Sequence, residues 1–135
     1  MFTDLDSSLF QASLHSMPCV NGFEVMKGFG GAKDIEARFE DAFTYLSINL
    51  APGFDELAGV VSWQRTVMLS PMEKRVRIIE AFDLKAPAEK ILFRFTTPWQ
   101  PEKNGDSAYI LGNVRLAWEG KLKSKAERFL LKQNI

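Results

Sequence analysis

The sequence contains few of the residues that form disulfides and metal sites. Its 135 residues include one cysteine, Cys19, and one histidine, His15. A single cysteine excludes an internal disulfide framework. One histidine and one cysteine cannot supply the four ligands of a structural zinc site. Cys19 is therefore interpreted as a small, partly buried apolar group.

Net charge and long apolar runs are also missing. The 17 basic and 17 acidic residues cancel, so no overall charge directs the chain to nucleic acid or to an anionic membrane. No apolar run approaches the roughly 20 residues of a membrane-spanning helix. The N-terminal stretch MFTDLDSSLFQ has acids and no basic segment, so it does not read as a signal peptide, and export would need a signal upstream.

Motifs of catalysis are not recognisable either. A triad that uses His15 is formally conceivable, but no G-x-S-x-G motif is present. The glycine-rich stretch 28–31 lacks a following Lys-Ser pair and a strand-turn-helix frame, which excludes a phosphate-binding loop. The acids show no arrangement that identifies a glycosidase pair. No catalytic residue is assigned in this chain, and the residues alone do not indicate a function.

The stretch 59–84 carries the clearest structural pattern. Its first half alternates, so that one face collects apolar side chains around Arg65, namely Val61, Trp63, Val67 and Leu69. Its second half places Val76, Ile78, Phe82 and Leu84 on one side. Residues 70–74 include Pro71, which favours a turn. We predict an antiparallel hairpin.

Similar alternation elsewhere predicts an all-β fold. It runs from Ile35 to Leu50, where a helix over residues 34–43 is the alternative, and recurs in 91–96 and 107–118. Residues 54–59 predict one helical turn, and 121–131 fit a strand slightly better than a helix. About seven or eight strands at spacings of about 8–12 residues indicate an antiparallel β-sandwich. We expect a single domain, 1–135, that buries all three tryptophans and most of the 11 phenylalanines.

Two kinds of residue are candidates for ligand contact. Five aromatic residues could stack on sugars, although core packing is favoured for each: Phe39, Phe43, Tyr45, Trp63 and Trp99. Trp99 is the best exception, because prolines flank it. Arg65 lies in an apolar strand face, and a lone buried charge is costly. We predict a salt bridge with Glu80 or Asp83 across the hairpin, with ligand contact as the alternative.

Three segments, read in order, form a recognisable pattern: LHSMPCVNGFEVMKG (14–28), FTYLSINLAPGFDELAGVVSWQRTVML (43–69) and VRIIEAFDLKAPAEKILFRFTTP (76–98). Together they resemble the C-terminal β-domain of the heparinase II/III-like family of polysaccharide lyases. The family typically has a histidine, a proline and Asn-Gly before its first strand. A W-x-R-x-v-x-l strand and a v-x-I-x-D-x-F strand follow. Glu80 departs from the usual aspartate, and the chain ends at Ile135, earlier than the family pattern.

The resemblance implies a larger parent. In the family an N-terminal α/α toroid precedes the β-domain, the active site lies between them, and its proton-transferring tyrosine and histidine have no match here. His15 resembles one ligand of the family's metal, usually Zn²⁺, whose other ligands would lie upstream. This chain alone is therefore expected to hold no zinc, because one imidazole binds it poorly.

The implied function is support of β-elimination in an acidic, uronate-containing polysaccharide, which could be heparan-like, alginate or another polymer. The alternatives are a stand-alone carbohydrate-binding module that uses Trp99, and a structural or interaction domain that forms homo-oligomers. The expected partners are the polysaccharide and the toroid, with no nucleic acid and no membrane. For the parent, a periplasmic or secreted location is favoured, and a cytoplasmic one stays open.

Overall fold

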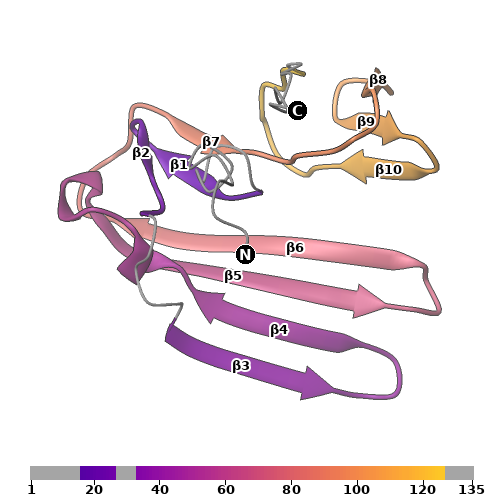
Figure 1. The fold of residues 1–135 in the computed structure, drawn as a ribbon, viewed down its shortest axis with the longest axis horizontal. Helices are drawn as coiled ribbons and strands as arrows, with labels where there is room; N and C mark the ends of the chain where they lie inside the picture. Colours follow the sequence, from indigo (N-terminus) through magenta and orange to yellow (C-terminus); the bar gives the residue numbers. More distant parts are fainter. Residues whose placement is uncertain (1–15, 27–32, 127–135) are drawn as a thin grey trace, which may run out of the picture. The chain divides into compact units, whose positions relative to one another are not determined.

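The computed structural model describes residues 16–26 and 33–126. The chain divides into two compact units, 1–96 and 97–135. The fold is all-β and sandwich-like, with three antiparallel sheets, which confirms the predicted fold class (Figure 1). The expectation of a single domain over residues 1–135 stays a prediction.

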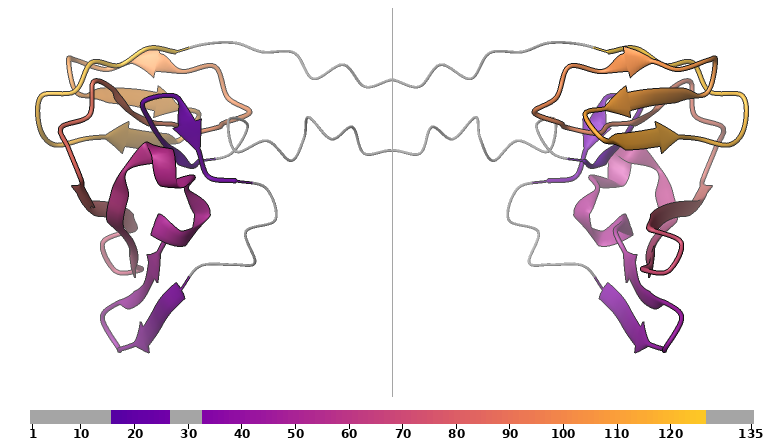
Figure 2. Two further views of the ribbon diagram at one scale, coloured as in Figure 1. Left: turned by 90° about the vertical axis from the view of Figure 1, so that its left-hand side faces the viewer. Right: turned by 90° about the vertical axis from the view of Figure 1, so that its right-hand side faces the viewer.

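The first unit contains two of the sheets. The smaller has the order β2-β1-β7, and the larger the order β3-β4-β5-β6. Their strands are β1 (Pro18–Val20), β2 (Phe23–Glu24), β3 (Lys33–Phe39), β4 (Thr44–Asn49), β5 (Val60–Ser70), β6 (Arg75–Leu84) and β7 (Ile91–Phe93). Two 3₁₀ turns, η3 (Ala51–Gly53) and η4 (Glu56–Ala58), connect β4 to β5. Figure 2 shows them as coiled magenta ribbon.

The predicted hairpin is confirmed as β5 and β6. Opposed residues include Trp63 with Phe82 and Arg65 with Glu80. One residue departs from the predicted face. A register shift between Val60 and Ser62 lets Val60 pack against the core and leaves Val61 53% exposed. A β-bulge inserts an extra residue and breaks the two-residue alternation, so the placement of Val61 beside Trp63 was wrong.

Three further segments were predicted as strands or as a helical turn: 35–50, 54–59 and 121–131. Residues 35–50 are extended, as predicted, but as two strands joined by a turn in which the amide of Glu40 donates to the carbonyl of Phe43 at 2.9 Å. The helical turn over residues 54–59 is confirmed as η4, where the Asp55 side chain accepts from the Leu57 amide at 2.8 Å. Residues 121–126 form no strand, and 127–131 lie outside the described residues.

The second unit contains the third sheet, with the order β10-β9-β8. Its strands are β8 (Glu102–Lys103), β9 (Ala108–Leu111) and β10 (Val114–Ala117). The run 107–118, predicted as one strand, is thus a hairpin. Gly112 in its turn has φ +64°, a left-handed conformation that glycine adopts without the steric cost of a Cβ atom.

The core of the first unit lies at one end of the large sheet. Trp63 is fully buried there and stacks on Phe82, with ring centroids 4.6 Å apart. The buried members of this cluster come from β1, the end of β2, β5 and the segment that contains η3 and η4: Val20, Val25, Leu50, Phe54, Ala58 and Trp63. Cys19 is also buried, as predicted.

Much of the large sheet is uncovered within the first unit. Phe39 is 81% exposed, and in the second unit Trp99 is 60% exposed. The expectation that packed sheets bury all three tryptophans was therefore wrong, and of the phenylalanines in residues 16–26 and 33–126 only Phe54 is buried. Strands of two or three residues span only about 7–10 Å, whereas β5 and β6 span more than about 30 Å, so the small sheet covers only one end of the large one.

Candidate functional site

Arg65, Glu80 and Trp63 form a hydrogen-bonded cluster beside the core. Arg65 Nε donates to Glu80 Oε1 at 2.6 Å, and Trp63 Nε1 donates to Glu80 Oε2 at 2.7 Å. The Arg65 and Glu80 side chains are only 12% and 11% exposed. The hairpin register produces this geometry, because Arg65 and Glu80 are directly opposed and Trp63 is the next residue on the same face.

The cluster also fixes the entry to β1. Arg65 Nη1 donates to the carbonyl oxygen of Ser16 at 2.6 Å, and the sulfur of Met17 lies 3.9 Å from the same nitrogen. Among the described residues, no buried side-chain polar atom lacks a partner. The predicted salt bridge of Arg65 is confirmed with Glu80 rather than Asp83. Through these hydrogen bonds, Arg65 connects β5 with β6 and with the segment that leads into β1.

Trp99 presents an aromatic surface in the second unit. Its side chain is 60% exposed, and its ring lies against Gly112, where an added Cβ atom would be 3.1 Å from Trp99 Cδ2. The backbone amide of Trp99 donates to the hydroxyl of Thr97 at 3.2 Å. A flat indole that is supported on one side and open to solvent has the geometry for stacking on a ligand ring.

The other candidate aromatics differ in their surroundings. Trp63 is a core residue, whereas Phe39 extends into solvent from the edge strand β3. Tyr45 lies opposite Arg38, whose guanidinium carbon is 5.5 Å from the tyrosine ring centroid. Desolvation, followed by the hydrogen bond with Glu36, raises the pKa of Tyr45. Phe43 is half-buried. Within the first unit, Trp63 thus belongs to the core, whereas Phe39, Phe43 and Tyr45 lie at the β3–β4 hairpin.

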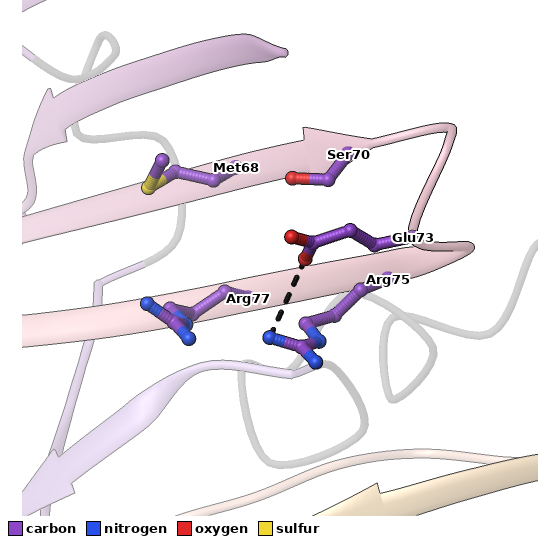
Figure 3. A pocket seen from close by; sticks show the side chains of 5 residues that line it. All are labelled: Met68, Ser70, Glu73, Arg75 and Arg77. Carbon is purple, nitrogen blue, oxygen red and sulfur yellow. Dashed lines mark ion pairs between the residues drawn. The ribbon is translucent and has the colours of Figure 1, made fainter. Parts of the chain in front are cut away.

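A shallow pocket lies on the large sheet near the β5–β6 turn. Met68, Ser70, Glu73, Arg75 and Arg77 line it (Figure 3). Arg75 Nη1 is 3.4 Å from Glu73 Oε2. The volume is about 180 Å³, below the roughly 300–1,000 Å³ of typical ligand sites, so the pocket fits a small group at most. This pocket was not predicted from the sequence, although two alternating arginines of β6, Arg75 and Arg77, are its sequence signal.

The predicted metal ligand is His15. His15 lies outside the described residues. Within residues 16–26 and 33–126, no group of three or more His, Cys, Asp or Glu side chains could hold a metal ion. The donors in these residues therefore do not fit a zinc site. In the same residues, no helix is long and apolar enough to cross a membrane.

Comparison of the chain with family models, curated proteins and solved structures finds no significant match.

Proposed function

We propose that this chain is the β-domain of a heparinase II/III-like polysaccharide lyase, in which it supports β-elimination of a uronate-containing polysaccharide. The observation that carries the proposal is the cluster around Arg65. It joins all three segments on which the resemblance rests, because Ser16 lies in 14–28, Trp63 and Arg65 in 43–69, and Glu80 in 76–98. The family's tryptophan and arginine motif and its acidic strand thus correspond to residues in direct contact.

In this proposal the chain has a framing role. Elimination requires a base that removes the proton α to the uronate carboxyl group. The bond to the 4-oxygen then breaks, which leaves an unsaturated sugar. Negative charge develops on the carboxylate, and positive or hydrogen-bonding groups stabilise it. The toroid of the parent would supply the base, and this chain would form one wall of the cleft.

Sequencing the transcript that carries the codons of this chain tests the assignment. The proposal predicts an in-frame helical domain upstream, with a tyrosine and further histidines available for proton transfer and metal binding. A stop codon directly before the codon for Met1, in every transcript, would refute the assignment. The chain would then be better explained as a carbohydrate-binding module or as a structural or interaction domain.

A second candidate is a carbohydrate-binding module, which the exposure of Trp99 favours. Titration of the full chain with uronate oligosaccharides, followed by calorimetry and tryptophan fluorescence, tests it. Binding that Trp99→Ala abolishes and Phe39→Ala preserves would support this function. Phe39 is the matched control, because it is also an exposed aromatic residue and belongs to the other unit. Equal binding by both variants would exclude a role for Trp99.

A further inference from the structure

We propose that two copies of this chain pair through the outer edge of β6, and this proposal is independent of the proposed function. β6 is the last strand of the order β3-β4-β5-β6, and in the described part of the chain only β5 pairs with it. An edge strand presents a row of backbone N–H and C=O groups that can pair with another strand. The partner must therefore be extended, and the sequence of β6 indicates that it is a second β6.

The two edges of the large sheet differ in their protection. The β3 edge has a register irregularity between Lys33 and Glu36, and Asp34 has φ +51°. Backbone irregularities of this kind hinder pairing at an edge. β6 pairs with β5 without interruption from Ser62 to Ser70, and its sequence RVRIIEAFDL contains no proline or glycine. β6 is thus the edge that remains competent for pairing.

Charge along β6 favours a second copy as its partner. The basic residues Arg75 and Arg77 lie at the beginning of the strand, and Asp83 lies near its end. Eight residues of strand separate Arg75 from Asp83 by roughly 26 Å, so the two cannot pair within one chain. When two identical strands run antiparallel about a twofold axis, the basic half of each lies beside the acidic half of the other.

One register satisfies both charge and apolar contacts. In an antiparallel pair, the residue numbers of opposed residues add up to a constant. With Ile79 opposite Ile79 of the second copy, Arg75 therefore faces Asp83 and Val76 faces Phe82. A shift of one step, which brings Arg77 opposite Asp83, would place the two Glu80 carboxylates face to face. Directly opposed like charges are destabilising, so we assign the register centred on Ile79.

The residues that this register brings together are exposed in the single chain. Val76, Ile79 and Phe82 are 59%, 42% and 40% exposed. Arg75 is 58% exposed, and Asp83 is also on the surface. Residues that are directly opposed in an antiparallel pair share a face. Pairing would therefore cover apolar side chains on both faces of β6 and extend the large sheet across the two copies.

The first test is the molar mass of the full chain, measured by light scattering across a wide range of protein concentrations. We expect a dimer that Ile79→Lys weakens by at least about tenfold in dissociation constant, because it places two lysines together at the axis. Ile35→Lys is the control, since Ile35 is exposed on the opposite edge and should leave the dimer unchanged. Circular dichroism verifies that both variants fold.

The second test uses charge reversal. Arg75→Asp and Asp83→Arg each place like charges opposite one another at both ends of the paired strands, so each variant alone should be largely monomeric. An equimolar mixture restores two opposite-charge pairs, and we expect it to form a heterodimer. This rescue distinguishes pairing from a general loss of structure, because neither variant is repaired by itself.

Three results would each overturn the proposal. The first is a chain that stays monomeric at every concentration. The second is a dimer on which Ile79→Lys and Ile35→Lys have equal effects, and the third is a mixture of Arg75→Asp and Asp83→Arg that associates no better than either variant alone.

Discussion

Arg65 and Glu80 face one another across β5 and β6, and Arg65 Nε lies 2.6 Å from Glu80 Oε1. Both side chains are nearly buried. Glu80 also accepts the indole N–H of Trp63, and Arg65 also donates to the carbonyl of Ser16. The pair thus connects the core tryptophan with the segment that leads into β1.

Removal of the arginine should therefore be costly. Arg65→Met leaves the carboxylate of Glu80 in a poorly solvated site without its cation, and we expect the free energy of unfolding to fall by about 3 kcal/mol. Urea denaturation measures this change. The matched control is Arg38→Met, because the Arg38–Glu36 pair is more than half exposed and water screens exposed pairs, so its loss should change the free energy of unfolding far less.

The double variant Arg65→Met/Glu80→Gln separates the loss of charge balance from the loss of packing. Glutamine can still accept the Trp63 N–H, so the double variant should recover a large part of the lost stability. If Arg65→Met alone is no more destabilising than Arg38→Met, the cluster does not connect the segments as described.

Trp63 is expected to be the most sensitive core position. It is fully buried and contacts the rings of Phe54, Phe82 and Phe93. Trp63→Ala should lower the free energy of unfolding by about 3–5 kcal/mol, because truncation of a buried aromatic leaves a cavity. Thermal or urea unfolding checks this value against Phe39→Ala, an exposed aromatic whose loss should change it by about 0.5 kcal/mol or less. Similar losses for the two variants would contradict the placement of the core.

Gly112 is expected to determine the position of the Trp99 ring. Gly112→Ala introduces a Cβ atom only 3.1 Å from Trp99 Cδ2, so the indole must move. The matched control is Gly105→Ala. Gly105 also has a positive φ, +74° against +64°, but nothing lies within 4 Å of its added Cβ atom. Both variants incur backbone strain of about 1 kcal/mol. Only Gly112→Ala should shift the side-chain NMR signals of Trp99, and equal shifts in both would contradict the contact.

Glu36 should titrate at a lower pH than an ordinary glutamate. The hydrogen bond from Arg38, followed by that from Tyr45, lowers the pKa of Glu36. A depressed carboxyl pKa means that the stabilisation is present above the ordinary pKa and is lost as the pH falls through the lowered value. NMR titration of the Glu36 carboxyl should show its midpoint rise in Arg38→Met, and rise less in Tyr45→Phe. A midpoint that is unchanged in Arg38→Met would exclude this pair in solution.

Local patterns predicted the hairpin and its ion pair. Alternation placed Trp63 and Arg65 on one face, and the cost of a buried charge indicated a partner on β6. The bulge at Val60–Ser62 was not predictable in this way, because one inserted residue reverses the faces without changing composition. The Gly-Asn pair at Gly112 favours a turn, but the same alternation continues on both sides of it, so the run 107–118 was predicted as one strand.

The burial of aromatics could not be predicted from the same patterns. Alternation shows which side chains share a face, but not how long the opposite sheet is. Phe39 is on the edge strand β3, and the strands of the small sheet are too short to reach across the large one. The exposure of Trp99 was indicated by its flanking prolines, because proline hinders regular pairing nearby.

The most direct test of the proposed lyase function is an elimination assay on the protein encoded by the complete reading frame that contains these residues. Uronate polymers, including heparan sulfate and alginate, are incubated with that product and, separately, with this chain, and the absorbance of unsaturated uronate is followed. The proposed function predicts eliminative product from the complete protein and none from this chain. Product formed by this chain alone, or no product from the complete protein with any uronate polymer, would contradict it.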